Sequence, residues 1–175
     1  MKNSPRPQGG RMEQRPIILG VPDRFDPHVL ATAAQLAGAL GTGLLCVHVD
    51  ATGYPLEELP DGTVRSAPLD PESGEEAIVR FPQELLLQLE AQLAGTEVHW
   101  QAHATAGGPG QQLARLAVRH DAALIVLGVR QRSMANVIRE LLNGSVALHL
   151  THRQRHPVLL VPPLPARRAE QIQSS

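Results

Sequence analysis

The chain has 175 residues, 42% of them hydrophobic and 2% aromatic, with 16 basic side chains against 17 acidic ones. This length is typical of a single domain. Its one cysteine, Cys46, excludes an internal disulfide, and no stretch approaches the ~20 consecutive apolar residues of a membrane helix. We therefore expect a reduced, cytoplasmic protein that makes no contact with membranes.

The two ends of the chain differ in composition from its middle. Residues 1–15 are basic and hold no apolar secretory segment, so we expect a disordered tail there and a second one at 164–175. The domain itself is expected to span 16–163. Lys2, in the first tail, is the only lysine, which excludes both a Walker-type phosphate loop and a Schiff-base enzyme.

Charge is distributed unevenly along the chain. Residues 50–80 hold eight acidic side chains against two arginines, whereas residues 113–156 hold seven arginines against two acidic side chains. We expect an anionic ligand, if there is one, at the arginine-rich segment. A pI near 6.7 and the scarcity of aromatic residues argue against a nucleic-acid partner.

Short apolar runs alternate with amphipathic helical patterns, which is typical of an α/β protein with an open parallel sheet and helices on both faces. In chain order the patterns predict a strand at Pro16–Val21, a helix after Asp26, a strand at Gly43–Val49, a long acidic loop at 51–81, a helix from Pro82, a strand at Val98–His103, a helix at Pro109–Arg119, a strand at Ala122–Gly128, helical spacing from Met134 to Leu142, a helix from Gly144-Ser145 to Leu150, and a last strand at Val158–Val161.

Local sequence signals are clear in two of these segments, the first helix and the acidic loop. Asp26 is a good N-cap for the first helix, Pro27 suits its first position, and Gly41 supplies its C-terminal stop. The acidic loop contains several prolines and an Asp61-Gly62 turn pair, so we expect an irregular surface insertion with at most a small hairpin at that pair.

Polar residues and glycines follow the predicted strands. Ligands of open parallel sheets bind outside the carboxyl ends of the strands, where the strand order reverses. The positions concerned are Pro22, Asp23, Asp26, Asp50, Gly107, Gly108, Gly128, Arg130 and Arg132. Gly144-Ser145 opens a helix, and helix N-termini favour phosphate, so Gly128 and Gly144 are predicted to flank a phosphate-sized niche.

Other chemistries have weaker support. His149, His152 and His156 fall close together, but the stretch lacks the cysteine or carboxylate ligands that a zinc site usually adds, so no metal site is expected. Asp23 and Asp26 resemble part of a phosphoacceptor pocket, yet the required lysine is missing. No G-x-S-x-G elbow is present, and no nucleophile has an evident base. The expectation is therefore a protein that is not an enzyme.

Three stretches near the C-terminus carry a family resemblance: Leu124–Gly128, Gly144–Ala147 and His156–Pro162. Together with Pro22-Asp23, His48–Asp50 and Gly107–Pro109, they make residues 14–163 resemble the universal stress protein family, and the segment around Arg139-Glu140 is similar to an actinobacterial subgroup. The resemblance implies a Rossmann-like sheet of the adenine nucleotide alpha hydrolase type, with strand order 3-2-1-4-5.

Nucleotide-binding members of that family carry G-x2-G-x9-G-[ST]. Here Gly128 and Gly144-Ser145 match, but Gln131 replaces the second glycine, and 12 residues, Arg132–Asn143, separate it from Gly144. A side chain at position 131 restricts the close approach of a ligand to the backbone, which a glycine would allow. Arg130 and Arg132 are placed to contribute charge-assisted contacts to phosphate.

The resemblance implies a stress-response role and an ATP-binding site, with slow ATP hydrolysis at most. Its implied cofactor-binding residues are Pro22, Asp23, Val49, Leu127, Gly128, Arg130, Arg132, Gly144, Ser145, Val146 and Ala147. It also implies a homodimer formed through the last strand, Val158–Val161. The alternative is a dimeric stress-related interaction module whose altered site no longer binds ATP.

Overall fold

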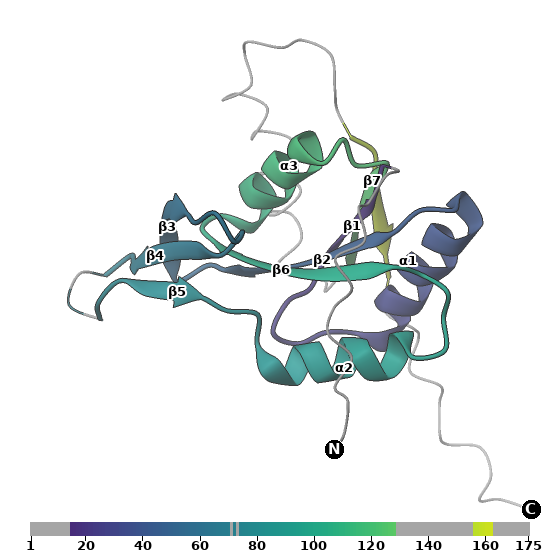
Figure 1. Cartoon of the computed structure of the whole chain (residues 1–175), viewed down its shortest axis with the longest axis horizontal. Coiled ribbons are helices and arrows are strands. Elements are labelled where there is room, and N and C mark those ends of the chain that lie inside the picture. Colours follow the sequence, from purple (N-terminus) through teal and green to yellow (C-terminus); the bar gives the residue numbers. More distant parts are fainter. Residues whose placement is uncertain (1–14, 71, 73, 129–155, 163–175) are drawn as a thin grey trace, which may run out of the picture.

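The computed structural model describes residues 15–70, 72, 74–128 and 156–162. Its main element is a five-stranded parallel sheet with the strand order β6-β2-β1-β7-β8 (Figure 1). The strands are β1 (Ile17–Gly20), β2 (Leu44–Asp50), β6 (Trp100–Ala106), β7 (Leu124–Gly128) and β8 (Val158–Val161). Numbered among themselves, these strands have the order 3-2-1-4-5, so the predicted topology is confirmed.

Helices cover both faces of this sheet. On one face α1 (Pro27–Leu40) and α2 (Gln83–Leu93) pack over side chains such as Leu19 and Cys46, and on the other α3 (Pro109–Arg119) packs over Ile18 and Val47 (Figure 1). Because adjacent residues of one strand enter opposite clusters, both faces of the strands are buried. This explains why the strands read as continuous apolar runs in the sequence.

The predicted end signals of α1 are confirmed. The Asp26 carboxylate accepts a hydrogen bond from the backbone N–H of His28 at 3.0 Å, and Pro27 occupies the first helical position. Gly41 ends the helix with a φ of 63°, in the left-handed region that glycine enters at little cost. These local contacts fix the point at which the chain leaves β1 and enters α1.

The acidic insertion was wrongly predicted as an irregular loop. It forms a second sheet of three antiparallel strands in the order β3-β4-β5: β3 (Gly53–Glu58), β4 (Val64–Pro68) and β5 (Ala77–Val79). The predicted turn at Asp61-Gly62 is confirmed, because it joins β3 to β4, with the Asp61 carboxylate accepting bonds from the N–H and hydroxyl of Thr63 at 3.0 and 2.7 Å. Val64 and Val79 are its only described side chains in a buried apolar cluster, so no apolar alternation announces these strands.

The small sheet stands out to one side of the parallel sheet, where all three of its strands contact β6 (Figure 1). The bounds predicted for β6, Val98–His103, were also wrong, since the strand runs from Trp100 to Ala106. Continuous parallel pairing with β2, from Leu44 opposite Trp100 to Asp50 opposite Ala106, sets these bounds. The helical segments predicted between Met134 and Leu150 lie outside the described residues.

No helix in the part of the chain that the structure describes is long and apolar enough to cross a membrane.

Candidate functional site

The carboxyl ends of β1, β2 and β7 form one edge of the parallel sheet. β1 pairs with β2 on one side and with β7 on the other, so the strand order reverses at β1. The N–H of Val21 donates to the carbonyl of Val47 at 2.8 Å, which continues the β1–β2 pairing by one residue. This parallel register brings the residues that follow β1, the end of β2 and the end of β7 to the reversal point, which is where open sheets of this kind bind ligands.

Asp23 and His48 face each other at this edge. The buried His48 ring lies with Nδ1 2.9 Å from the carbonyl oxygen of Val21. Because a carbonyl oxygen only accepts, Nδ1 carries the hydrogen, and in the neutral ring Nε2 carries only a lone pair. Nε2 lies 3.7 Å from Asp23 Oδ1. The Asp23 side chain is 89% exposed and open to a ligand.

Three other predicted residues lie at the same edge with different exposures. Pro22 is exposed beside Asp23, and Val49, near the end of β2, is half-buried against the cluster beneath α3. Leu127 is buried in that same cluster. At Leu127 only the backbone is left to meet a ligand, because the side chain is part of the core.

Gly128 has a packing role that the sequence did not indicate. A Cβ built at this position would lie 2.9 Å from Cγ2 of Val29, on α1. Val29 is β-branched and buried, so it has little freedom to move aside. The glycine therefore lets α1 approach β7, and this requirement is independent of any ligand.

The structure thus brings together Pro22, Asp23, Val49, Leu127 and Gly128 of the predicted set. The remaining predicted residues lie outside the described ones: Arg130, Arg132, Gly144, Ser145, Val146 and Ala147. Among the described residues, no group of three or more His, Cys, Asp or Glu side chains is arranged to hold a metal ion. His149 and His152 lie outside these residues, and His156 binds the carbonyl of Ala122 through Nδ1 at 2.9 Å.

Cys46 lies inside β2 with its side chain fully buried. Burial raises the pKa of the Cys46 thiol to about 12, so the reactive thiolate is absent near neutral pH. Its prediction as a small buried hydrophobe is confirmed.

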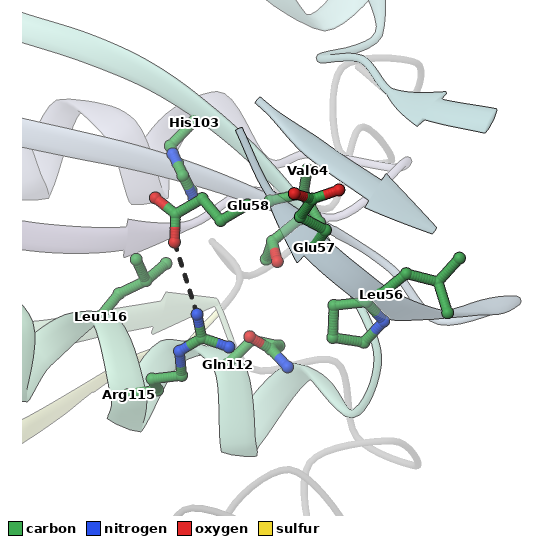
Figure 2. A pocket seen from close by; sticks show the side chains of 10 residues that line it. Leu56, Glu57, Glu58, Val64, His103, Gln112, Arg115 and Leu116 are labelled. Carbon is green, nitrogen blue, oxygen red and sulfur yellow. Dashed lines mark hydrogen bonds and ion pairs between the residues drawn. The ribbon is translucent and has the colours of Figure 1, made fainter. Parts of the chain in front are cut away.

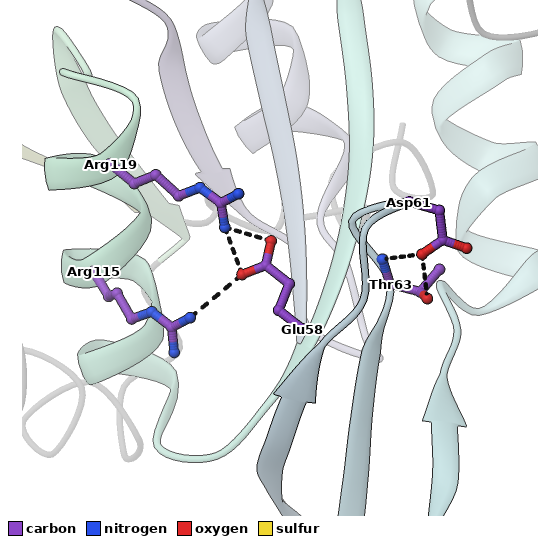
Figure 3. A network of polar contacts seen from close by, with 5 residues as sticks. All are labelled: Glu58, Asp61, Thr63, Arg115 and Arg119. Atoms are coloured by element: carbon purple, nitrogen blue, oxygen red, sulfur yellow. Dashed lines mark hydrogen bonds and ion pairs between the residues drawn. The ribbon is translucent and has the colours of Figure 1, made fainter.

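A pocket that sequence reasoning missed lies between the small sheet, β6 and α3 (Figure 2). Its lining residues are Pro55, Leu56, Glu57, Glu58, Val64, His103, Thr105, Gln112, Arg115 and Leu116. At its wall Glu58 on β3 accepts hydrogen bonds from Arg119 and, at 3.4 Å, from Arg115 of α3 (Figure 3). The opposite charge of the segments 50–80 and 113–156 was the available signal, because Glu58 of the first meets Arg115 and Arg119 of the second here.

Two ionisable groups at this pocket are perturbed. The hydrogen bond from Arg119 holds the pKa of Glu58 below its ordinary value, and the charges of both arginines act in the same direction. Burial lowers the pKa of His103, and the Glu58 carboxylate partly offsets that effect. Near neutral pH, Glu58 is therefore ionised and His103 is uncharged.

Residues 14–162 match the sequence model of the universal stress protein family. None of the curated proteins matches the chain in sequence. Among solved structures, a universal stress protein from Archaeoglobus fulgidus is similar with 19% identity and a TM-score of 0.53, over 84% of this chain and 93% of that one. A universal stress protein from the same organism in complex with dAMP has 20% identity and a TM-score of 0.52, over 85% and 98%.

A third structure, of a universal stress protein family member from Burkholderia pseudomallei, has 21% identity and a TM-score of 0.52, over 87% of this chain and 98% of that one. At these identities the structural likeness concerns the fold. The match to the family's sequence model covers both the parallel sheet and the insertion, and so extends over the whole described domain. The chain belongs to the universal stress protein family.

Proposed function

We propose that this protein binds an adenine nucleotide at the carboxyl edge of β1, β2 and β7. We propose further that the nucleotide-bound form of the protein acts in a stress response. The observation that carries the proposal is the convergence of Asp23, Val49 and Gly128 at the reversal of the strand order. These residues are far apart in the sequence and lie at or just after the ends of three strands. A universal stress protein of the same fold was crystallised with dAMP, which supports this choice of ligand.

The described residues fit the adenine end of such a ligand. The exposed Asp23 carboxylate is an acceptor for the exocyclic amino group of adenine, because its oxygens have lone pairs open to a ligand. The backbone at Val49, at the half-buried end of β2, is placed to meet the base edge. Gly144-Ser145 and the side chains of Arg130 and Arg132 supply phosphate-binding groups in the sequence.

We propose ATP as the physiological ligand and binding, with slow hydrolysis at most, as the activity. Gln131 and the longer spacing before Gly144 alter the segment that would meet the phosphates. The adenine end is not altered in this way. We therefore expect AMP and ATP to bind with similar affinities. Most of the selectivity for adenine over other bases should arise at Asp23.

The test is calorimetric titration of nucleotide-stripped protein with AMP and with ATP. Asp23→Asn should weaken both by about tenfold, because it removes a charged hydrogen-bond acceptor for the base. Gly144→Asp should weaken ATP at least tenfold, because it places an anion beside the phosphates. Glu90→Gln, which removes one exposed carboxylate from α2, is the matched control and should change neither affinity.

If Asp23→Asn and Gly144→Asp both left the affinities for AMP and ATP unchanged, the nucleotide would have to bind at a different site. A wild-type protein that releases no nucleotide on denaturation and gives no heat with AMP or ATP would contradict nucleotide binding itself.

The second candidate function is a dimeric interaction module, and one observation favours it. β8 is an edge strand of the sheet, and three of its four side chains, Val158, Leu159 and Leu160, are 36–40% exposed. An edge strand with exposed apolar side chains favours pairing with a second chain. We propose a homodimer through β8, which sedimentation of the wild type and of Leu159→Lys would test. A monomeric wild type at micromolar concentration would exclude it.

A further inference from the structure

The pairing of β1 with β2 ends where a side chain takes the place of a backbone group. The register runs to Gly20 opposite Val47, and the N–H of Val21 still donates to the carbonyl of Val47 at 2.8 Å. The next bond of a parallel ladder would run from the N–H of Val49 to the carbonyl of Val21. That carbonyl instead accepts a hydrogen bond from Nδ1 of His48 at 2.9 Å. Val49 therefore lies beyond the last pair of the two strands.

The direction of the Val49 backbone follows from the alternation along β2. The carbonyl of Val47 faces β1, because it accepts the N–H of Val21. Backbone groups two residues apart in a strand point to the same side, so the N–H and carbonyl of Val49 also face the side of β1. The strand β1 has already ended there, at Gly20. Val49 thus presents its backbone to the space beyond β1, where the adenine base is proposed to lie.

Packing holds the His48 ring in one place. Its side chain is 7% exposed and lies on the same face of β2 as Cys46, since strand residues two apart share a face. Phe81, which precedes α2, packs edge-on against the ring, with the ring centroids 5.9 Å apart and the planes at 64°. A buried ring with such neighbours donates its hydrogen from one defined position.

The ring contacts both ends of the segment 21–23. Nδ1 binds the Val21 carbonyl, and Nε2 lies 3.7 Å from Oδ1 of Asp23. Between them, Pro22 has no N–H and cannot continue a ladder. The Asp23 side chain is 89% exposed, so little around it holds it in position. The place of the Asp23 carboxylate therefore depends on the backbone that His48 holds at Val21.

We propose that His48 is a positioning residue of the adenine site. By donating to the Val21 carbonyl, His48 leaves the N–H of Val49 to the base. The same hydrogen bond fixes the segment that carries Asp23, the acceptor for the amino group of adenine. This inference rests on the proposed nucleotide function, because it assigns a role within that site. It adds that the preference for adenine depends on a residue that does not touch the ligand.

The test is calorimetric titration of the nucleotide-stripped, full-length protein with AMP and with IMP. Adenine offers an amino donor beside a ring-nitrogen acceptor, which suits a carboxylate next to a backbone N–H, whereas the base of IMP offers the reverse. The wild type should therefore bind AMP at least about tenfold more tightly than IMP. His48→Leu should weaken AMP about tenfold and IMP much less, because the freed Val21 carbonyl recruits the N–H of Val49.

His48→Asn is the conservative variant. Its side-chain amide can place an N–H where the imidazole has Nδ1, so it should bind AMP within about threefold of the wild type and keep the preference over IMP. Both His48→Asn and His48→Leu lose the ring contact with Phe81, so the two variants differ in the donor to Val21. Thermal unfolding of each variant checks that the fold is intact.

His103→Leu is the matched control. It makes the same chemical change at a partly buried histidine of β6, away from the segment 21–23. The affinities for AMP and IMP should change no more than about twofold. An AMP loss in His103→Leu equal to that in His48→Leu would show that affinity only follows stability, and it would overturn the role of His48.

The remaining outcomes separate this inference from the proposed function. Equal AMP affinities in the wild type and His48→Leu, or an AMP loss in His48→Asn as large as in His48→Leu, would overturn the positioning role and leave nucleotide binding in place. A wild type that binds neither AMP nor IMP would contradict the proposed function, and the positioning role with it. NMR of the ring nitrogens in the free protein needs no ligand: a hydrogen on Nε2 in place of Nδ1 would overturn the role of His48 alone.

Discussion

The two sheets of this protein are held together by different forces. The parallel sheet buries apolar side chains on both faces, and residues such as Ile17, Ile18 and Leu19 have no exposed surface. The small antiparallel sheet buries little more than Val64 and Val79, against alanines of β6, and adds turn hydrogen bonds and the ion pairs of Glu58. We infer that the parallel sheet determines global stability, whereas the small sheet is an accessory element whose local order depends on its contacts with β6 and α3.

The comparison predicts its largest difference for truncations in the two sheets. Leu19→Ala removes a fully buried side chain beneath α1 and should lower the free energy of unfolding by about 2–5 kcal/mol. Val64→Ala should lower it by no more than about 1 kcal/mol, since fewer atoms are lost from a smaller cluster. Urea unfolding of the two variants measures both values.

Hydrogen exchange sharpens this first prediction. Val64→Ala should speed exchange at the amides of β3 and β4 while leaving β1 and β2 protected, because a weakly packed unit opens locally. Equal loss of global stability in the two variants would mean that the two sheets unfold as one unit and that the contrast drawn between them is wrong.

Glycine substitutions should give the next largest difference. Gly128→Ala forces a Cβ to within 2.9 Å of Val29 Cγ2 and should cost about 1–3 kcal/mol, as overpacking in a core does. Gly62→Ala meets no atom within 4 Å, but its φ of 82° disfavours a side chain, so the cost should be about 1 kcal/mol.

The same two variants separate packing from backbone conformation. Gly62→Asn should recover part of the loss, because asparagine tolerates the left-handed region better than alanine does. Gly128→Ser should recover nothing, since any Cβ meets Val29. A Gly128→Ala protein as stable as the wild type, in the same urea unfolding assay, would show that α1 moves away at no cost.

The contrast between the sheets also explains what the sequence could predict. Strands buried on both faces, such as Leu124–Gly128, appear as apolar runs. Their parallel arrangement followed from the alternation with helices, and their order from the family resemblance. The strands of the insertion carry prolines and charges and have few fully buried side chains, so no periodic apolar pattern marked them. Only Asp61-Gly62 carried a signal there, because its turn chemistry is local.

The candidate sites divide in the same way. Asp23 and Gly128 could be predicted because the carboxyl edge of a parallel sheet is a general ligand position. The pairing of Glu58 with Arg115 and Arg119 could not, because it joins residues more than 50 positions apart in the sequence across an unpredicted sheet. The contact of His48 with Val21 and Asp23 likewise depends on the register of β1 and β2. Contacts between elements require the tertiary structure, whereas turns and caps do not.

The smallest predicted effect is a pH dependence at the junction of the two sheets. Burial lowers the pKa of His103 from its ordinary value of 6.5, so the unfolded chain gains a proton before the folded protein does. Stability should therefore fall as the pH drops below about 6.5, and His103→Gln should remove less than about 1 kcal/mol of that fall. His120, whose pKa is lowered by burial and by Arg119, contributes in the same direction and remains in this variant.

Glu58→Gln tests the coupling between the sheets through the same measurement. The Glu58 carboxylate raises the pKa of His103 against the effect of burial, so its removal should make the loss of stability below pH 6.5 steeper. The contribution of Glu58 itself is present above its ordinary pKa of 4.5 and is lost only as the pH falls through its lowered value, so it does not interfere in the higher range. Urea unfolding of the wild type, His103→Gln and Glu58→Gln across this range measures both effects. A profile for Glu58→Gln that is flatter than that of the wild type would place Glu58 away from His103 in solution, and the small sheet would then not be held against β6 and α3 as the structure has it.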